Sequence, residues 1–317
     1  MLNVELSVKC GNFKSDYFQT DTGAPQGDCA SANEFTFYLA KTLEQEHNHS
    51  ETDSSSILKE HSYFTPQQTK HTTTNQEYAD DISEITSNPE RIKHIKTTLP
   101  SKLAARNLTI NHSKTEEYTT SRKNCNNSWK NCKLLGSILD TENDIKRRKG
   151  LTIDALHKLN YIFNSNKLSI NTKMKAFNTY ISSIFLYNSE IWTLTANREN
   201  SINSFHRRIL RTYVLNIKWP TIINNTDVYA KTKTKPWSDT IKVRRMRWFG
   251  HAMRLHEDTP VRKALAYARE KYYRPKGRPL TTWMSMMTHQ LVNEHKLTWE
   301  EACVKAQNRD DWREYTK

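Results

Sequence analysis

The sequence has no long hydrophobic run and few cysteines, and each shortage excludes a class of protein. No apolar stretch approaches the roughly 18 residues that cross a membrane, and Met1–Cys10 lacks the hydrophobic core of a secretion signal. The five cysteines are an odd number without a paired pattern, which argues against a secreted disulfide scaffold. We therefore expect an intracellular protein of the nucleus or cytoplasm, with free thiols and no membrane span.

Apolar residues are also scarce, at 36% of the 317 residues, so the hydrophobic core must be modest. Aromatic residues nevertheless make up 10%, which is more than a disordered polycation would carry. The chain is therefore expected to fold, and its length leaves room for about two domains of ~150 residues each.

Charge is distributed unequally along the chain. Residues 1–145 hold 15 basic and 20 acidic side chains, whereas residues 146–317 hold 33 basic and 14 acidic ones. The net charges are thus −5 and +19. An excess of this size suggests a surface that binds a polyanion, and nucleic acid is the commonest polyanion. A basic surface that is merely solvated is the alternative that charge alone leaves open.

The spacing of apolar residues predicts an α+β fold. In the first half, alternating residues predict a hairpin over residues 3–20, and two strand-prone segments flank Ala79-Asp80-Asp81. A helix is expected over Glu90–Arg106, where Pro100 should bend or divide it. The second half reads as mostly helical, because its apolar residues recur every three or four positions.

Two adjacent carboxylates, Asp80 and Asp81, stand at the turn between the two strand-prone segments. Pairs of this kind are common in solvated turns, so the pair alone is a weak signal. A two-metal phosphoryl-transfer site, however, needs carboxylates that hold divalent cations roughly 3.5–4 Å apart. Mg²⁺ prefers such oxygen ligands, and a tight hairpin would present both carboxylates rigidly.

Further motifs stand in a fixed order around Tyr78-Ala79-Asp80-Asp81. Gly23-Ala24-Pro25-Gln26-Gly27 precedes it, and Leu108–Glu116, Leu134–Asp140, Phe185–Leu194, Arg245–His251 and Asn308–Arg313 follow it. This ordered series resembles the reverse transcriptases of non-LTR (LINE-like) retrotransposons, from the palm onward, and it covers nearly the whole chain. The resemblance implies an RNA-directed DNA polymerase that uses Mg²⁺ and has RNA and DNA as partners.

The resemblance also implies a role for each matching residue. Asp80 and Asp81 would be the catalytic, metal-binding pair, and Tyr78 would lie near the primer end and the incoming nucleotide. Lys114 resembles a palm lysine near the triphosphate that could neutralise or protonate the departing pyrophosphate. The loop that approaches template and nucleotide would contain Gly23, Pro25, Gln26 and Gly27.

In architecture, the resemblance implies a partial palm over residues 1–145, a helical thumb over residues 146–220 and a basic helical C-terminal domain over residues 221–317. Leu135-Gly136 resembles the hairpin that grips the primer. The cations expected to bind nucleic acid are Arg147, Arg148, Arg207, Arg208, Arg244, Arg245 and Arg247. Exposed tryptophans could stack on unpaired bases. The alternative is that Trp192, Trp237, Trp248 and Trp283 belong to the core.

One part of the family's active site has no counterpart here. Such polymerases draw a further metal-binding aspartate from a palm strand upstream of the glycine-rich loop, and residues 1–22 offer only Glu5, Asp16 and Asp21 as acids. The fingers and an endonuclease domain are missing as well. Because the charge developing on the transferring phosphoryl group would be incompletely neutralised, we expect an inactive carboxy-terminal part of such an enzyme. A non-catalytic nucleic-acid-binding remnant is the alternative.

Overall fold

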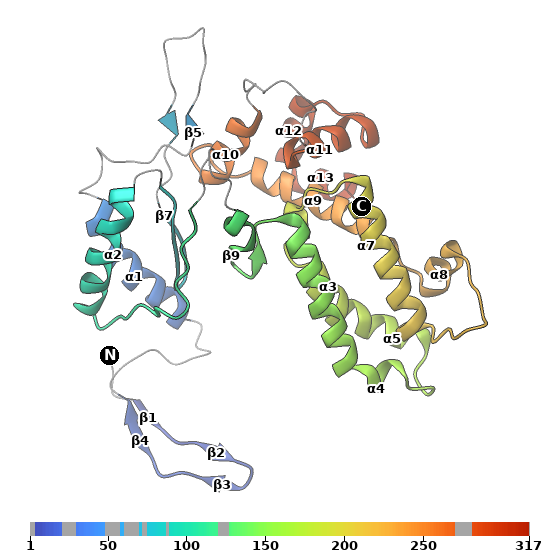
Figure 1. Cartoon of the computed structure of the whole chain (residues 1–317), viewed down its shortest axis with the longest axis horizontal. Coiled ribbons are helices and arrows are strands. Elements are labelled where there is room, and N and C mark those ends of the chain that lie inside the picture. Colours follow the sequence, from blue (N-terminus) through green and yellow to red (C-terminus); the bar gives the residue numbers. More distant parts are fainter. Residues whose placement is uncertain are drawn as a thin grey trace. The chain divides into compact units, whose positions relative to one another are not determined.

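The computed structural model describes residues 4–20, 30–47, 58–59, 70–71, 75–86, 89–119, 127–269 and 281–316. The chain forms two compact units, Met1–Thr115 and Glu116–Lys317, which divide upstream of the boundary expected after residue 145. The fold is mostly helical with small antiparallel sheets, and is therefore α+β as the spacing predicts (Figure 1). Among the described helices, none is long and apolar enough to cross a membrane.

A long hairpin begins the first unit. β1 (Val4–Leu6) pairs antiparallel with β4 (Phe18–Thr20), and β2 (Lys9–Cys10) pairs with β3 (Phe13–Lys14). Gly11, at the turn between β2 and β3, has a φ of +60°, which glycine adopts without strain. The hairpin predicted over residues 3–20 is thus confirmed. A second short antiparallel pair joins β5 (Leu58–Lys59) to β6 (Lys70–His71).

The core of the first unit lies between two helices and a hairpin (Figure 1). These elements are α1 (Ser31–His47), α2 (Pro89–Ala104), β7 (Asn75–Tyr78) and β8 (Asp81–Glu84). Leu43 of α1 and Leu103 of α2 are buried together, and Ile82 of β8 packs against them. The expected division of α2 at Pro100 does not occur. Packing of Leu99 and Leu103 on both sides of the proline offsets the hydrogen bond that it cannot donate.

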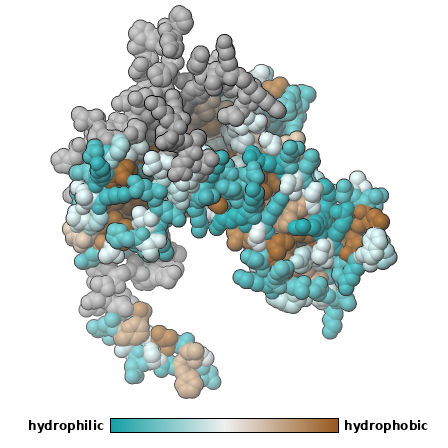
Figure 2. All heavy atoms as spheres, viewed as in Figure 1, coloured by the Kyte–Doolittle hydropathy of each residue, from teal (hydrophilic) through white to brown (hydrophobic). Residues whose placement is uncertain are grey.

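Helices make up nearly all of the second unit. Its first part contains η1 (Asn127–Asn131), β9 (Lys133–Leu134), β10 (Ser137–Ile138), α3 (Thr141–Lys158), α4 (Asn160–Phe163), α5 (Ile170–Ala176), η2 (Phe177–Ser182), α6 (Ser183–Phe185), η3 (Ser189–Ile191), α7 (Ala196–Ile209) and η4 (Leu210–Val214). Its second part contains α8 (Asn225–Thr232), α9 (Trp237–Met253), α10 (Pro260–Arg269), α11 (Trp283–His289), η5 (Gln290–Glu294), α12 (Trp299–Gln307) and α13 (Arg309–Tyr315). Hydrophilic residues dominate its visible surface (Figure 2).

Helix α9 takes part in two hydrophobic cores. Its first half contributes Trp237 and Ile241 to a core that reaches back to Ile145 on α3. Its second half contributes Phe249 to a core that includes Trp312 of α13. Residues on both sides of position 220 therefore share one core. Trp192 and Trp237 are buried, which confirms the core alternative for these two tryptophans.

Helix α13 packs closely on α9 because Gly250 has no side chain. Trp312 is 2% exposed, and its Nε1 donates a hydrogen bond to the Met246 carbonyl at 2.9 Å. A Cβ atom built on Gly250 would overlap the Trp312 indole ring. The motifs Arg245–His251 and Asn308–Arg313, far apart in sequence, thus meet at this contact.

We expect Gly250→Ala to lower the free energy of unfolding by about 2 kcal/mol, because the added methyl group must displace the indole ring. Gly150→Ala is the matched control, since Gly150 lies within α3 with no neighbouring atom within 4 Å of a built Cβ. Its stability should rise by up to about 1 kcal/mol. Urea unfolding followed by tryptophan fluorescence measures the free energy of unfolding of both variants. A Gly250→Ala variant as stable as the wild type would contradict the close packing of α13 on α9.

His206 lies at the centre of the first core without a polar partner. Its ring stacks on Trp237 with centroids 4.2 Å apart and planes 4° from parallel, and Phe177 stacks nearby at 6.0 Å. Neither ring nitrogen has a hydrogen-bond partner among the described residues. Burial, assisted by the charge of Arg207, lowers the pKa of His206 from 6.5 to about 3. The imidazole is therefore neutral in the folded chain at physiological pH.

Because His206 is buried in its neutral form, the free energy of unfolding depends on pH. Between pH 6.5 and about 3, the unfolded chain binds a proton at His206 that the folded chain excludes, so acid favours unfolding. In that window His206 should contribute a loss of roughly 1.4 kcal/mol per pH unit as the pH falls, and above it the contribution should be constant. We expect His206→Phe, which keeps a flat ring against Trp237, to show a shallower decline. Urea titrations at several pH values measure the two slopes, and identical slopes would refute the assignment.

Candidate functional site

The predicted acidic turn is a tight hairpin in the first unit. Tyr78 of β7 pairs with Asp81 of β8, so that Ala79 and Asp80 alone form the loop. Ala79 has a φ of +53°, a left-handed conformation that residues other than glycine rarely adopt. Tyr78, Asp80 and Asp81 are all exposed. The hairpin therefore presents an aromatic ring and two carboxylates to solvent from a strained two-residue turn.

The donors on this hairpin fit Mg²⁺ in kind but not in number. Carboxylate oxygens of Asp80 and Asp81 are hard ligands of the type that Mg²⁺ prefers. In the part of the chain that the structure describes, however, no group of three or more acidic, histidine or cysteine side chains could hold a metal ion. Glu5 and Asp16 lie on the first hairpin and do not join the pair. A two-metal site would need more ligands than the described residues bring together at this hairpin.

Among the other residues that the resemblance assigns to a polymerase site in this unit, Lys114 lies in the described part of the chain. Lys114 is exposed in the segment after α2, and no hydrogen bond or ion pair between described residues joins it to Asp80 or Asp81. Gly23, Pro25, Gln26 and Gly27 lie outside the described residues, as does Asp21.

A second hairpin, β9–β10 in the second unit, carries the Leu135-Gly136 motif. Leu135 has a φ of +46° and Gly136 a φ of +77°. Positive φ at both central residues is what a type I′ hairpin turn requires. Leu135 remains 37% exposed at the tip. The turn therefore holds an apolar side chain outward on a conformation that leucine seldom adopts.

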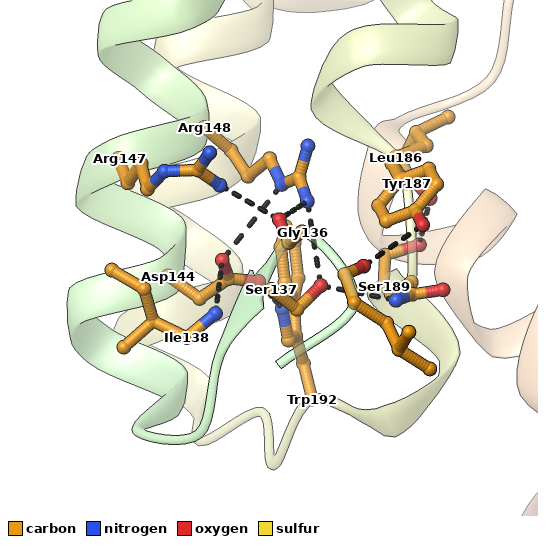
Figure 3. Close-up of polar contacts among 12 residues, drawn as sticks. Gly136, Ser137, Ile138, Asp144, Arg147, Arg148, Leu186, Tyr187, Ser189 and Trp192 are labelled. Atoms are coloured by element: carbon orange, nitrogen blue, oxygen red, sulfur yellow. Dashed lines mark hydrogen bonds and ion pairs between the residues drawn. The ribbon is translucent and has the colours of Figure 1, made fainter. Parts of the chain in front are cut away.

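Side chains from two distant segments brace this turn (Figure 3). Arg147 Nη1 and Arg148 Nη2 both donate to the Gly136 carbonyl, at 2.8 and 2.5 Å. The Tyr187 hydroxyl donates to the Leu135 carbonyl at 2.9 Å. The Arg148 guanidinium also lies over the Tyr187 ring, 4.6 Å from its centroid. The motif Phe185–Leu194 thus meets the Leu135-Gly136 turn.

One buried carboxylate, that of Asp144, joins all these parts (Figure 3). Asp144 is fully buried on α3; its Oδ1 accepts from the Ile138 backbone N–H at 3.0 Å and its Oδ2 from Trp192 Nε1 at 2.8 Å. Arg148 Nε lies 3.8 Å from Oδ1. Sequence reasoning missed Asp144, although its spacing of four residues before Arg148 on one helix was a usable signal.

Arg148 and Arg245, both expected to contact nucleic acid, are buried and form hydrogen bonds within the second unit. Arg245 is 2% exposed and donates to Gln290 Oε1 and to the Trp192 carbonyl, both at 3.2 Å. Desolvation lowers the pKa of both guanidinium groups, and Asp144 opposes that shift at Arg148. Arg244 likewise donates to the Leu186 carbonyl at 2.6 Å. Arg244 and Arg245 point toward the irregular segment Leu186–Trp192 because backbone carbonyls at its two ends need hydrogen-bond donors, and helix α9 provides them.

The remaining cations expected to bind nucleic acid lie nearer the surface. Arg208 and Arg247 are exposed, whereas Arg207 is half-buried and donates to Ser204 Oγ at 3.1 Å. Arg208 also lies 5.5 Å from the centroid of the Phe205 ring. Arg208 and Arg247 are therefore the members of the expected set that are open to a phosphate.

Comparisons with known proteins add no relative: no protein-family model, curated protein or solved structure matches the chain.

We expect Asp144→Asn to lower the free energy of unfolding by about 3 kcal/mol, because the amide leaves Arg148 without its buried counter-ion and turns a donor toward Trp192 Nε1. Asp154→Asn, at an exposed position on the same helix, is the matched control and should change stability by less than about 0.5 kcal/mol. Thermal unfolding followed by circular dichroism measures both variants. A wild-type midpoint for Asp144→Asn would show that the carboxylate is dispensable.

Proposed function

We propose that the chain is the carboxy-terminal part of the reverse transcriptase of a non-LTR retrotransposon. The observation that carries the proposal is the Tyr78–Asp81 hairpin. Motif order predicts a metal-binding turn there, and the turn has two exposed carboxylates and a strained residue, Ala79, between them and Tyr78. Left-handed alanine is costly, and such strain gathers at functional sites.

In this proposal, Asp80 and Asp81 hold Mg²⁺, which neutralises charge on the transferring phosphoryl group when it is bound. Tyr78, 68% exposed beside the pair, offers a ring against which a primer end or nucleotide can pack. The β9–β10 hairpin also supports the proposed polymerase function. A turn that positions a nucleic-acid strand must be rigid, and Arg147, Arg148 and Tyr187 brace this one at two successive carbonyls.

We expect the 317 residues by themselves to extend no DNA primer on an RNA template with Mg²⁺ or Mn²⁺, because the described carboxylates supply only part of a two-metal site. The measurement is incorporation of labelled nucleotide, with Asp80→Asn run in parallel. Incorporation that disappears in Asp80→Asn would contradict the expected inactivity, and would mean that another acid completes the site.

A second function, nucleic-acid binding without catalysis, is favoured by the charge of the second half. Residues 146–317 carry 33 basic and 14 acidic side chains. Arg208 and Arg247 are exposed there, and so are the lysines at positions 231, 233 and 235. Cations of this kind bind phosphates by releasing counterions, without any need for a catalytic carboxylate.

We expect the full chain to bind single-stranded RNA with an affinity that falls steeply with salt. Removing both exposed arginines (Arg208→Ala with Arg247→Ala) should make the slope of log K against log salt shallower by about 1.4, at roughly 0.7 for each phosphate contact on a single strand. Lys93→Gln on α2, exposed in the acidic first half, is the control and should leave the slope unchanged. Fluorescence anisotropy across a salt series measures the slopes, and salt-independent binding would refute this function.

A further inference from the structure

An open polar cleft of about 630 Å³ lies in the second unit, and its lining includes no residue of the β9–β10 hairpin. It is formed by the end of α3, by α4 and the residues after it, and by η4 with the segment that follows. Its lining includes Asn160, Asn164, Asn166, Asn216, Tyr213 and Lys218. Clefts of this size accept small organic groups. Neither the polymerase resemblance nor the charge distribution assigns it a role.

The chemistry of the lining matches the edge of a nucleobase. Each asparagine amide carries a donor and an acceptor side by side, the pattern that base edges complement. Asn164 Nδ2 donates to Asn160 Oδ1 at 3.0 Å, which holds two of these amides together. Among the described residues no carboxylate lines the cleft, and the exposed Lys218 adds a positive charge to its lining. The cleft thus favours a polar, anionic ligand.

Tyr213 lines the cleft together with the amides, and a second aromatic residue, Trp219, adjoins the lining residue Lys218 in the chain. Tyr213 is half-buried and held edge-on against Phe163, with ring centroids 6.4 Å apart, so its orientation is fixed before any ligand arrives. Trp219 directly follows Lys218 and is 86% exposed. Its segment is anchored, because the Ile217 N–H donates to the Arg211 carbonyl at 2.9 Å and the Thr221 N–H to the Lys218 carbonyl at 3.0 Å. An exposed tryptophan on an anchored segment is a stacking surface.

We propose that this cleft binds an unpaired nucleotide of single-stranded RNA or DNA. The base stacks on Tyr213 or Trp219, the asparagine amides contact its edge, and Lys218 contacts a phosphate. A protein partner would instead need a larger apolar surface than a cleft lined with amides provides. The proposal rests on the nucleic-acid binding proposed above, and it adds a site that recognises bases as well as backbone charge.

The experiment compares a 12-nucleotide single-stranded oligonucleotide with an abasic one of equal length and charge, using the full chain. Trp219→Ala combined with Asn166→Ala should weaken binding of the normal oligonucleotide about 5- to 150-fold, the range for losing one base stack. Binding of the abasic oligonucleotide and the salt slope should stay unchanged. Tyr180→Ala, an exposed aromatic on η2 that neither lines the cleft nor adjoins a lining residue in the chain, is the matched control and should bind like the wild type.

The outcomes distinguish the base-binding cleft from the charge-based nucleic-acid binding on which it rests. If the folded wild type binds both oligonucleotides equally and the double variant changes nothing, the cleft is not a base site, while charge-based binding stands. If the folded wild type binds neither oligonucleotide, the nucleic-acid function itself fails and this proposal fails with it. Equal weakening by Tyr180→Ala would also overturn the assignment, because the loss would not be specific to the cleft.

Discussion

The second unit is organised around the buried carboxylate of Asp144. With Arg148 beside it, this group connects helix α3 to the β9–β10 hairpin and to the irregular segment Leu186–Trp192. A charge removed from water must be paired and hydrogen-bonded, so each of these segments is fixed relative to the carboxylate. The strained Leu135-Gly136 turn persists because these contacts determine its conformation. Buried polar contacts thus fix the conformation of the hairpin tip that presents Leu135 to solvent.

Local patterns in the sequence predict the hairpin over residues 3–20 and the helical character of the second half. Ser169 caps α5, and Thr298 caps α12 with a reciprocal capping box to Glu301, so both helix starts are set by residues close together in the chain. The acidic hairpin at Tyr78–Asp81 also follows from short-range alternation and the turn between the strands. At Pro100 the sequence alone left division of the helix open, and α2 continues through the proline, with Leu99 and Leu103 packed on either side of it.

The candidate site was only partly predictable because burial depends on contacts distant in sequence. Arg148 and Arg208 look alike in the sequence, yet one is buried beside Asp144 and the other is exposed. Asp144, four residues before Arg148, is a local difference, but the carbonyl to which Arg148 donates belongs to a hairpin that precedes its helix. The same holds for Gly250, whose need for glycine is set by Trp312. The order of motifs therefore predicts which segments meet in the fold better than it predicts which of their side chains are exposed to a ligand.

In the proposed function, both hairpins, β7–β8 and β9–β10, contact a nucleic-acid strand. Hydrogen–deuterium exchange of the full chain, with and without a DNA primer annealed to an RNA template, measures this contact. We predict slower exchange at residues 75–84 and 133–138 in the complex, in proportion to the fraction bound. Confirmed binding with unchanged exchange at both hairpins would contradict the claim.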